Sequence, residues 1–467
     1  MLIVVGTVHS GKTEFGNAAR SLGFHVVEMG DKVRELHSQE DPERPITDFV
    51  TRKFIQEGKD VIAKCVVNRI KSCSRLDTKK LVIIGPRTHE EIIYLKRNLG
   101  YARTVLVEAN SRDRYNRWRA NVGLLRPRSP EMTYEEFIER NHIEYKWGLS
   151  QVLTCKNDII TNEQALSTFK RKAKAYLKEI LSKEDLLLGR FEMKELLGAG
   201  QSKETWKAYD HQLGRDVALK QLIIQNGIQK LLGEARTASS LRHENIAQIF
   251  EFYEEEGILA EEYVEGKDLR SKIKENCLRG TPMSITDSAE IFAQLLEAVC
   301  AAHDADRLHG DIKPANVMLC SGDKIKVKLT DFEVGTILSE IAQEGDQPMG
   351  GSRNYMAPEM LEGKPRSKQT DLFSLGIVGY LLFTHRNPFQ HPSGVIPIEE
   401  MIKLRTFNPA HMTEWNPALP QRLDDIVLKL LARDLGDRYE EAENVKRDFS
   451  SINFKEETGV MEIRQEL

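Results

Sequence analysis

Five short segments between Leu197 and Glu359 most limit how the chain can fold, because they carry glycines and charged residues in a fixed order. In chain order they are Leu197-Gly198-Ala199-Gly200, Val217-Ala218-Leu219-Lys220, Leu308-His309-Gly310-Asp311-Ile312-Lys313-Pro314-Ala315-Asn316, Leu329-Thr330-Asp331-Phe332 and Ala357-Pro358-Glu359. Any one of them alone has an ordinary structural explanation. All five together indicate one site to which distant parts of a single domain contribute.

The first two segments suit the binding of phosphate groups. Glycine has no Cβ atom, so Gly198 and Gly200 let the backbone approach phosphate oxygens closely. Lys220 ends an alternating, strand-like run, and its ammonium group would pair with the α- and β-phosphates of ATP. Glu234, on the next predicted helical stretch, is the expected ion-pair partner that holds Lys220 in place.

The third and fourth segments suit the transfer of a phosphoryl group. We expect Asp311 to accept or orient the proton of an acceptor hydroxyl group. Lys313 would neutralise charge on the group that is transferred. Asn316 and Asp331 carry side-chain oxygen atoms and are the predicted ligands of Mg²⁺.

From Gly198 to Arg438 the motifs resemble the eukaryotic-type Ser/Thr protein kinase family in its bacterial and archaeal form. The resemblance implies a two-lobed α+β protein kinase fold over residues 188–450, with ATP between the lobes. Since Lys313 stands two residues after Asp311, it also implies protein substrates with Ser or Thr acceptors.

The same resemblance assigns two structural roles. A hinge is expected at Glu261-Glu262-Tyr263-Val264, where Glu262 and Val264 would contact ATP. Arg438 stands where the family has a buried partner for Glu359.

Three positions depart from the family pattern. Lys203 replaces the third glycine of the glycine-rich loop, Gly310 replaces an arginine before the catalytic aspartate, and Glu333 replaces a glycine after Phe332. Without that arginine, a phosphate on the activation segment has less to pair with. We therefore expect that phosphorylation is not the main switch at the hydroxyl residues of this segment, Thr336, Ser339 and Ser352. The charged catalytic groups are all present, so we expect an active enzyme, with a non-catalytic pseudokinase scaffold as the alternative.

A second phosphate-binding pattern lies at the start of the chain. The apolar run Leu2–Val5 predicts a buried strand, and Gly6-Thr7-Val8-His9-Ser10-Gly11-Lys12-Thr13 then matches G-x-x-x-x-G-K-[ST] in full. In such a loop Gly6 and Gly11 allow backbone N–H groups to point at phosphate oxygens. Lys12 would contact the β- and γ-phosphates, and Thr13 would place its hydroxyl group on Mg²⁺.

The first 165 residues alternate between strand-like and helical stretches. Strands are expected at 24–28, 80–84 and 104–108 in addition to Leu2–Val5. This alternation predicts an α/β P-loop NTPase domain, a parallel sheet with helices on both faces. The stretch 166–187 is predicted to be an exposed linker helix that closes this domain or leads to the next, and 451–467 a polar tail.

Charged residues follow two of these strands. Asp31 and Arg34 come after the second strand, and Arg87 and Glu91 after the third. Further arginines crowd the region after the fourth strand, at Arg112, Arg114, Arg117, Arg119, Arg126 and Arg128. Guanidinium groups suit phosphate binding, although a solvated helix with ion pairs is the favoured explanation for any single one.

Residues 1–165 resemble the dephospho-CoA kinase and nucleoside monophosphate kinase group. The resemblance is carried by the loop at Gly6–Thr13 and by Met29-Gly30-Asp31-Lys32-Val33-Arg34-Glu35. It implies a small-molecule or nucleotide ligand in this domain. Ile84 stands where related proteins carry an aspartate, so this domain is expected to bind nucleotide yet turn it over poorly.

Composition narrows the remaining function classes. With 467 residues and a net charge of −4, the chain suits more than one domain and shows no bias toward nucleic acid. The six cysteines have no zinc-ligand spacing, and no apolar run reaches the ~20 residues that span a bilayer. We therefore expect a cytoplasmic protein with no membrane partner.

Three functions stay open at this point. The chain is predicted to be an ATP- and Mg²⁺-dependent Ser/Thr protein kinase with a regulatory nucleotide-binding domain. The alternatives are a bifunctional enzyme that also phosphorylates a small molecule or nucleotide, and a scaffold that binds ATP without transfer. Two nucleotide sites in one chain also suggest that a ligand at one site changes affinity at the other.

Overall fold

The computed structural model describes residues 1–72, 77–125, 132–154, 156–163, 165–182, 186–200, 203–222, 241–253, 256–332, 354–389 and 398–454. The chain forms two compact units. The first contains Met1–Gln225 and Glu256–Ile258, and the second contains Asn226–Glu255 and Leu259–Leu467.

A five-stranded sheet organises the N-terminal part of the first unit. Its strands are β1 (Leu2–Val5), β2 (His25–Glu28), β3 (Leu81–Ile84), β4 (Arg103–Glu108) and β5 (Asp158–Thr161). They lie in the order β2-β3-β1-β4-β5, and every neighbouring pair is parallel. The predicted parallel sheet is therefore confirmed, with β5 as a strand that the sequence had not indicated.

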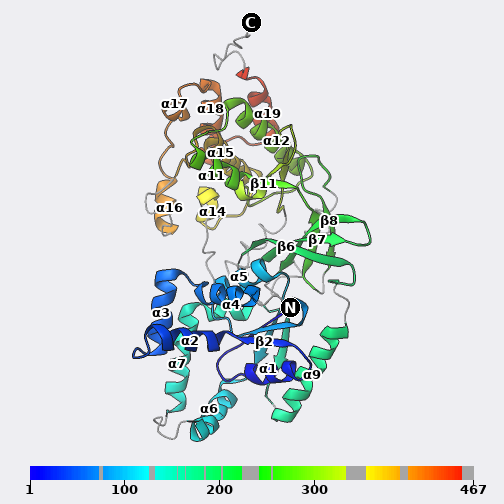
Figure 1. Cartoon of the computed structure of the whole chain (residues 1–467). Helices are drawn as coiled ribbons and strands as arrows, with labels where there is room; N and C mark the ends of the chain where they lie inside the picture. Colours follow the sequence, from blue (N-terminus) through cyan, green and yellow to red (C-terminus); the bar gives the residue numbers. More distant parts are fainter. Residues whose placement is uncertain are drawn as a thin grey trace, which may run out of the picture. The chain divides into compact units, whose positions relative to one another are not determined.

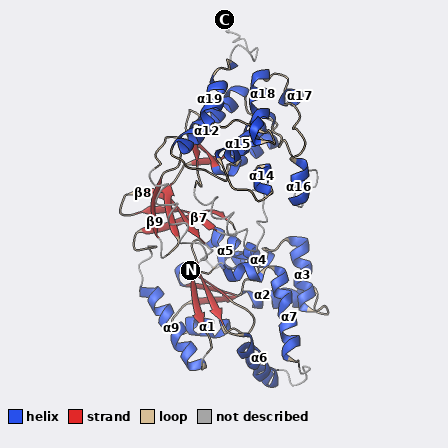
Figure 2. Ribbon diagram, turned by 180° about the vertical axis from the view of Figure 1, so that it is seen from behind, coloured by secondary structure: helices blue, strands red, loops and turns tan. Residues whose placement is uncertain are grey.

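Helices cover both faces of this sheet, as the alternation of side chains in β1 requires (Figure 2). Leu2 and Val4 join a core with α1 (Lys12–Arg20) and α9 (Leu166–Ser182). Ile3 and Val5 join a second core on the opposite face. The helices of that face are α2 (Met29–Glu40), α3 (Ile46–Glu57), α4 (Val61–Ser72), α5 (His89–Leu99) and α8 (Leu149–Thr154).

Two further helices follow β4, namely α6 (Ser111–Leu125) and α7 (Tyr134–Trp147), and a short 3₁₀ turn, Thr78–Lys80, precedes β3. Helix α9 was expected to be exposed, but one side of it is buried. Phe169, Ala173 and Leu177 are fully enclosed and belong to the same core as Phe15 of α1. This helix is thus an integral layer of the N-terminal fold.

Three antiparallel strands complete the first unit. They are β6 (Phe191–Ala199), β7 (Lys203–Asp210) and β8 (Arg215–Leu222). Along β7 alternate residues are buried, and these are Glu204, Trp206, Ala208 and Asp210. Helix α5 lies beside β6 in Figure 1 and contacts it.

The second unit contains two small groups of strands. β9 (Ile249–Tyr253) and β10 (Ile258–Glu262) are neighbours in one sheet. β11 (Gly266–Asp268), β12 (Val317–Cys320) and β13 (Val327–Leu329) form an antiparallel sheet of their own.

The described part of the second unit also contains helices. They are α11 (Leu269–Arg279), α12 (Ile285–Asp304), α14 (Pro358–Leu361), α15 (Lys368–Thr384), α16 (Ile398–Leu404), α17 (Met412–Trp415), α18 (Gln421–Leu430) and α19 (Ala442–Ser450), with 3₁₀ turns at Pro314–Asn316 and Leu435–Asp437. Helix α15 is apolar along most of its length, which is typical of a helix surrounded by its own domain. A Cβ atom at Gly379 would press against the ring of Phe292, and one at Gly376 against Leu430, so these glycines let α12 and α18 approach α15 closely.

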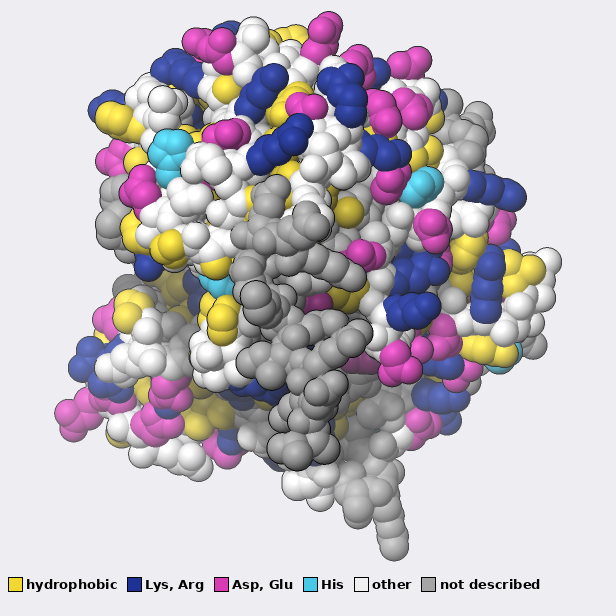
Figure 3. Space-filling view, turned by 90° about the horizontal axis from the view of Figure 1, so that it is seen from above, with side chains coloured by type: hydrophobic (Ala, Val, Ile, Leu, Met, Phe, Trp, Pro, Cys, Tyr) yellow, Lys and Arg dark blue, Asp and Glu magenta, His cyan; other side chains and the backbone are white. Residues whose placement is uncertain are grey.

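The surface of the described residues carries charges of both signs. On the face in Figure 3, lysine and arginine side chains lie among aspartate and glutamate side chains. None of the helices in the described residues is long and apolar enough to cross a membrane.

The buried face of α9 leads to a first prediction. Phe169→Ala should lower the free energy of unfolding by about 3–5 kcal/mol, because it leaves a cavity between α9 and the sheet. Urea denaturation followed by circular dichroism measures this change. Lys174→Ala, on the exposed side of the same helix, should change stability by less than about 0.5 kcal/mol. Equal effects of the two substitutions would show that α9 is not part of the core.

Candidate active site

The buried carboxylate of Asp371, at the start of α15, fixes the loop that carries the predicted catalytic residues. Its Oδ2 atom accepts a hydrogen bond from the backbone N–H of His309 (2.8 Å), and its Oδ1 atom accepts one from that of Gly310 (2.7 Å). The side chain of His303, in the last turn of α12, lies 3.1 Å from Oδ2. Asp371 therefore ties the loop to two helices of the core.

His309 holds the loop from the other side. Its Nε2 atom lies 2.9 Å from the carbonyl oxygen of Thr330, while its Nδ1 atom accepts a hydrogen bond from the backbone N–H of Asp311 (3.1 Å). This pattern places the ring proton on Nε2. Burial lowers the pKa of His309, so the neutral ring is favoured. The ring also packs edge-on against Phe332, with centroids 4.6 Å apart.

Two predicted catalytic residues and one predicted metal ligand meet in this loop. The Lys313 ammonium group lies 2.5 Å from Oδ2 of Asp311. The amide nitrogen of Asn316 donates to the carbonyl oxygen of Asp311 (2.8 Å) and lies 3.2 Å from its Oδ2 atom. With its nitrogen turned toward Asp311, the Asn316 side chain presents its oxygen on the other side, as a metal ligand would.

Asp331, the fourth residue of this group, follows β13. Its backbone has a φ of 68°, in the left-handed region that non-glycine residues seldom adopt. The preceding Thr330 is fixed by its backbone N–H, which donates to the carbonyl oxygen of Asn316 (2.9 Å). The donor set of an amide oxygen and a carboxylate suits Mg²⁺, which prefers oxygen ligands.

Gly310 stands where the protein kinase family has an arginine, and its backbone lies close to another arginine. Its φ is 73°, and a Cβ atom built on it would collide with the guanidinium group of Arg366. Arg366 lies between α14 and α15, more than 50 residues further along the chain. A positive charge therefore lies beside the catalytic loop after all, but it comes from a different segment.

The predicted pair of Glu359 and Arg438 is confirmed. Nη1 of Arg438 lies 2.8 Å from Oε1 of Glu359, and both side chains are buried. Arg438 also donates to the carbonyl oxygens of Gln369 and Ala432, so its charge is fully hydrogen bonded. The pair joins α14 to the turn before α19.

The predicted hinge residues lie at the end of β10 and directly after it. The side chain of Glu262 accepts hydrogen bonds from Lys328 (2.9 Å) and from the backbone N–H of Gln248 (3.2 Å). Val264 is buried. Glu261 is buried as well.

In the first unit, the glycine-rich segment forms the tip of a hairpin. Gly198 pairs with Thr205 across β6 and β7, and the N–H of Gly200 donates to the carbonyl oxygen of Lys203 (2.9 Å). Lys220 lies on β8 directly opposite Thr205 and is buried. Its predicted partner Glu234 lies outside the described residues, as do Glu333, Thr336, Ser339, Ser352, Arg126 and Arg128.

The loop Gly6–Thr13 connects β1 to α1, as its pattern requires. Lys12 is buried and donates to the carbonyl oxygens of Gly6 and Thr7, both at 2.6 Å. Gly11, the residue before α1, has a φ of 114°. Thr13 is exposed in the first turn of the helix. Gly6 is buried so close to Val107 that a Cβ atom would collide with its carbonyl oxygen.

Guanidinium groups surround this loop. Arg117 donates to the carbonyl oxygens of His9 (3.3 Å) and Asn162 (2.5 Å), and Arg114 reaches Val8 (3.5 Å). Burial, together with the charges of Arg87 and Arg114, lowers the pKa of Lys12 well below its ordinary value. Within the described residues, Nε of Arg114 is buried without a hydrogen-bond partner. The ammonium group of Lys12 and the guanidinium groups around it would favour the binding of an anion at this loop.

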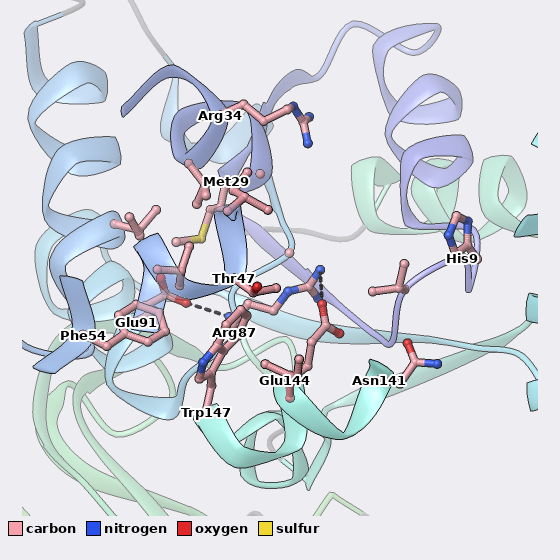
Figure 4. Close-up of a pocket in the computed structure, with 18 of the residues that line it drawn as sticks. His9, Met29, Arg34, Thr47, Phe54, Arg87, Glu91, Asn141, Glu144 and Trp147 are labelled. Atoms are coloured by element: carbon pink, nitrogen blue, oxygen red, sulfur yellow. Dashed lines mark hydrogen bonds and ion pairs between the residues drawn. The ribbon is translucent and has the colours of Figure 1, made fainter. Parts of the chain in front are cut away.

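A cavity of about 300 Å³ opens beside the loop (Figure 4). Its walls combine apolar side chains with a few charged ones. Apolar residues of the lining include Met29, Val33, Val50, Phe54, Phe137 and Trp147, and the charged ones are Arg34, Arg87, Glu91 and Glu144. Such a composition is typical of sites for small molecules.

Arg87 and Glu144 point toward each other across this cavity and pair at 3.1 Å. Nη1 of Arg87 also reaches the carbonyl oxygen of Gly6 (3.4 Å). Glu91 accepts hydrogen bonds from the backbone N–H groups of Arg87 (2.6 Å) and Thr88 (3.2 Å), and burial raises its pKa to about 7. Among the described residues, Oε2 of Glu144 is buried and has no partner.

Sequence reasoning missed several of these residues. It did not identify Asp371 as the anchor of the catalytic loop, nor Arg366 beside Gly310. Nor did it single out Asn162, whose amide donates to the carbonyl oxygen of Ser10 (2.7 Å). Within the described residues no group of three or more His, Cys, Asp or Glu side chains could hold a metal ion by itself.

Comparison with known proteins identifies the later part of the chain. The sequence profile of the protein kinase domain matches residues 191–450. The serine/threonine-protein kinase PrkC of Bacillus subtilis is 34% identical over 270 residues, which cover 56% of this chain and 40% of that protein. The probable serine/threonine-protein kinase PknB of Lactococcus lactis is 30% identical over 272 residues, covering 56% of this chain and 42% of that protein.

These relatives are longer than the matched region, so the chain spans less than half of their length. Among solved structures, the kinase domain of Mycobacterium tuberculosis PknI, crystallised as a double mutant, matches 58% of this chain and 96% of its own. The two are 22% identical with a TM-score of 0.45.

The contact of Gly310 with Arg366 leads to a second prediction. Gly310→Arg should lower the free energy of unfolding by about 2 kcal/mol or more, because a left-handed φ costs a side chain about 1–2 kcal/mol and Arg366 occupies the space. Gly363→Arg is the matched control, since its φ is 77° and no atom lies near a Cβ there.

Thermal denaturation of the full chain separates the cost of the left-handed backbone from the cost of the clash with Arg366. Gly363→Arg should show only the backbone cost, and Gly310→Arg should lose more. Adding Arg366→Ala to Gly310→Arg should recover part of the loss. If Gly310→Arg were no more destabilising than Gly363→Arg, Arg366 would not occupy the space.

Proposed function

This chain belongs to the protein kinase family, and from that premise we propose that it is an ATP- and Mg²⁺-dependent enzyme that phosphorylates Ser or Thr residues of proteins. One observation carries the proposal. The carboxylate of Asp311 lies between the side chains of Lys313 and Asn316 in a loop that Asp371 anchors to the core. Matched relatives named serine/threonine-protein kinases support the choice of acceptor.

In this proposal Asp311 orients the acceptor hydroxyl group and takes its proton. Because Asp371 and His309 fix the loop backbone, the carboxylate needs little rearrangement before transfer. Lys313, now 2.5 Å from Asp311, stays close enough to neutralise charge on the group that is transferred.

The residues present fit a magnesium-bound nucleotide. Asn316 and Asp331 would hold the metal ion, which would neutralise phosphate charge during transfer. Lys220 would contact the α- and β-phosphates, and the glycine-rich tip at Gly198 and Gly200 would cover them. The backbone at Glu262 and Val264 would contact the adenine ring.

The proposed role of Asp311 gives a third prediction. Asp311→Asn keeps the shape of the side chain but removes its capacity to accept a proton, so kcat should fall by about 10²–10⁴-fold. The measurement is transfer of label from γ-labelled ATP to a basic protein acceptor.

Asp323→Asn is the matched control, because Asp323 is exposed in the loop between β12 and β13. It should transfer label at the rate of the unmutated chain. Label transfer by Asp311→Asn within tenfold of the unmutated rate would refute the role of Asp311. ATP binding without any transfer by the unmutated chain would instead favour a scaffold.

We also propose that the N-terminal domain binds a nucleotide at Gly6–Thr13. The loop leaves the carboxyl end of the central strand β1, whose neighbours β3 and β4 lie on opposite sides. In parallel sheets of this kind ligands bind where the chain changes direction in this way. Helix α1 directs its first N–H groups at the loop, and Lys12 and Arg114 add positive charge. The adjacent cavity favours an alternative function, in which this domain phosphorylates a small molecule bound there. Ile84, which stands where related proteins carry an aspartate, weakens this alternative.

Two nucleotide sites make a fourth prediction. The unmutated chain should bind about two molecules of a non-hydrolysable ATP analogue, and Lys12→Ala and Lys220→Ala should each bind about one. Isothermal titration calorimetry measures the stoichiometry. Lys174→Ala, an exposed lysine of α9, should behave as the unmutated chain. If the unmutated chain bound only one molecule of the analogue and Lys12→Ala also bound one, the proposed N-terminal site would be refuted.

A further inference from the structure

A buried ion pair joins the N-terminal domain to the hairpin that carries the glycine-rich segment. Lys96, in the last turn of α5, lies 2.6 Å from Oε1 of Glu204 on β7, and the side chains are only 2% and 3% exposed. The second oxygen of Glu204 accepts a hydrogen bond from the indole N–H of Trp206 (3.1 Å). A lone charge buried here would be strongly unfavourable, so each partner depends on the other.

Two more contacts surround this pair. The ring of Tyr101 packs edge-on against that of Trp206, with centroids 5.4 Å apart, and Trp206 is completely buried. At the other end of the helix, the imidazole of His89 lies near the backbone of Gly200, which acts to raise its pKa while burial lowers it. Helix α5 and Tyr101, two residues beyond its end, thus contact the hairpin along one side.

These contacts lie on one face of the hairpin, and Lys220 lies on the other. Successive residues of a strand point to opposite faces, so Glu204 and Trp206 share one face while Thr205 points the other way. Lys220 is directly opposite Thr205 across β7 and β8 and shares its face. The contacts of Glu204 and Trp206 with the N-terminal domain therefore lie on the face of the hairpin opposite to the one that carries Lys220.

The first turn of α5 lines the cavity of the N-terminal domain. Arg87, two residues before His89, faces the cavity and pairs with Glu144. Glu91 also lines the cavity and completes the capping box of α5 with Thr88. The start of α5 and the segment before it therefore line the cavity through Glu91 and Arg87, while His89 of the same turn lies near Gly200 of the hairpin.

The cavity has the chemistry of a site for a small anion with an apolar body. Arg34 and Arg87 supply two guanidinium groups, which suit a phosphate or carboxylate group. Phe54 and Trp147 supply aromatic surface on the same cavity. Nucleoside monophosphates combine these two features.

We propose that this cavity is an effector site, and that a small phosphate-bearing molecule bound there controls phosphotransfer by moving α5 against the glycine-rich hairpin. The inference rests on the proposed kinase function. A ligand that pairs with Arg87 competes with Glu144 for the same guanidinium group, and Arg87 precedes the capping residues of α5. A change there reaches Glu204 through Lys96, because Arg87, His89 and Lys96 belong to one short helix and the segment that caps it. Coupling of this kind is reciprocal, so ATP at the kinase site must change effector affinity by the same factor.

The first test removes the link and leaves both sites in place. In the double variant Lys96→Met/Glu204→Gln no charge is left buried, and the glutamine still accepts from Trp206. We expect the KM for ATP in phosphotransfer to change at least fivefold, and the amides of residues 191–210 to exchange faster with deuterium.

Arg97→Met is the matched control, because Arg97 is the exposed neighbour of Lys96 on α5. It should leave the KM and the exchange unchanged. A double variant with the KM and exchange of the unmutated chain would overturn the link through α5.

The second test needs no substitution. AMP, GMP, CMP and UMP, each at 1 mM, are the probes, with binding followed by equilibrium dialysis and phosphotransfer by label from ATP. We expect at least one to bind and to change the KM for ATP fivefold or more, and the double variant to bind it without that change. Arg34→Gln should weaken its binding about tenfold, as expected for a lost charged hydrogen bond. Arg69→Gln, an exposed arginine of α4, should not.

The outcomes separate the two proposals. Absence of phosphotransfer with and without every probe refutes the kinase function itself. Phosphotransfer that a bound probe does not alter refutes only the effector site. Failure of all four probes to bind refutes the assigned ligand class.

Discussion

The hydrogen bonds to the buried carboxylate of Asp371 are the constraint on which the catalytic loop depends. A carboxylate out of water must be fully hydrogen bonded, and here its partners are two backbone N–H groups of the loop and the side chain of His303. Hydrogen bonds to a charged group contribute about 1.5–3 kcal/mol each. They keep residues 309–311 in one conformation, including the left-handed φ of Gly310. The positions of Asp311, Lys313 and Asn316 all follow from that conformation.

Much of this fold follows from local patterns in the sequence. The apolar run Leu2–Val5 and the loop after it predicted a buried strand that leads into a helix, and β1 and α1 have those positions. Strand β5 was not predicted because its only apolar residues, Ile159 and Ile160, stand between polar ones. It lies at the edge of the sheet. The buried side of α9 was missed because its three buried residues are separated by lysines and other exposed residues.

Contacts between distant residues could not be predicted from one sequence. Glu204 and Trp206 alternate with half-buried residues on β7, but nothing near them in the chain identifies Lys96, which is 108 residues away, as a partner. Arg366 likewise reaches Gly310 only because α14 and α15 bring its segment back to the catalytic loop. In the first case the sequence shows only an acid on a strand, and in the second only a glycine where the family has an arginine. The compensating charge is visible only in three dimensions.

The burial of Glu204 and Trp206 also bears on why the two nucleotide-binding patterns occur in one chain. A glycine-rich hairpin must yield when nucleotide enters and leaves, because it covers the phosphates. Here one face of that hairpin contacts α5 through an ion pair, and the segment that follows α5 through an aromatic contact. Movement of the hairpin must therefore either break these contacts or carry α5 with it. In the second case Arg87 and Glu91 move as well, and the cavity of the N-terminal domain changes shape with each cycle of the kinase site. If the N-terminal domain had no influence on the kinase site, an apolar contact would hold the hairpin against α5 equally well. The buried ion pair of Lys96 and Glu204 would then not be needed.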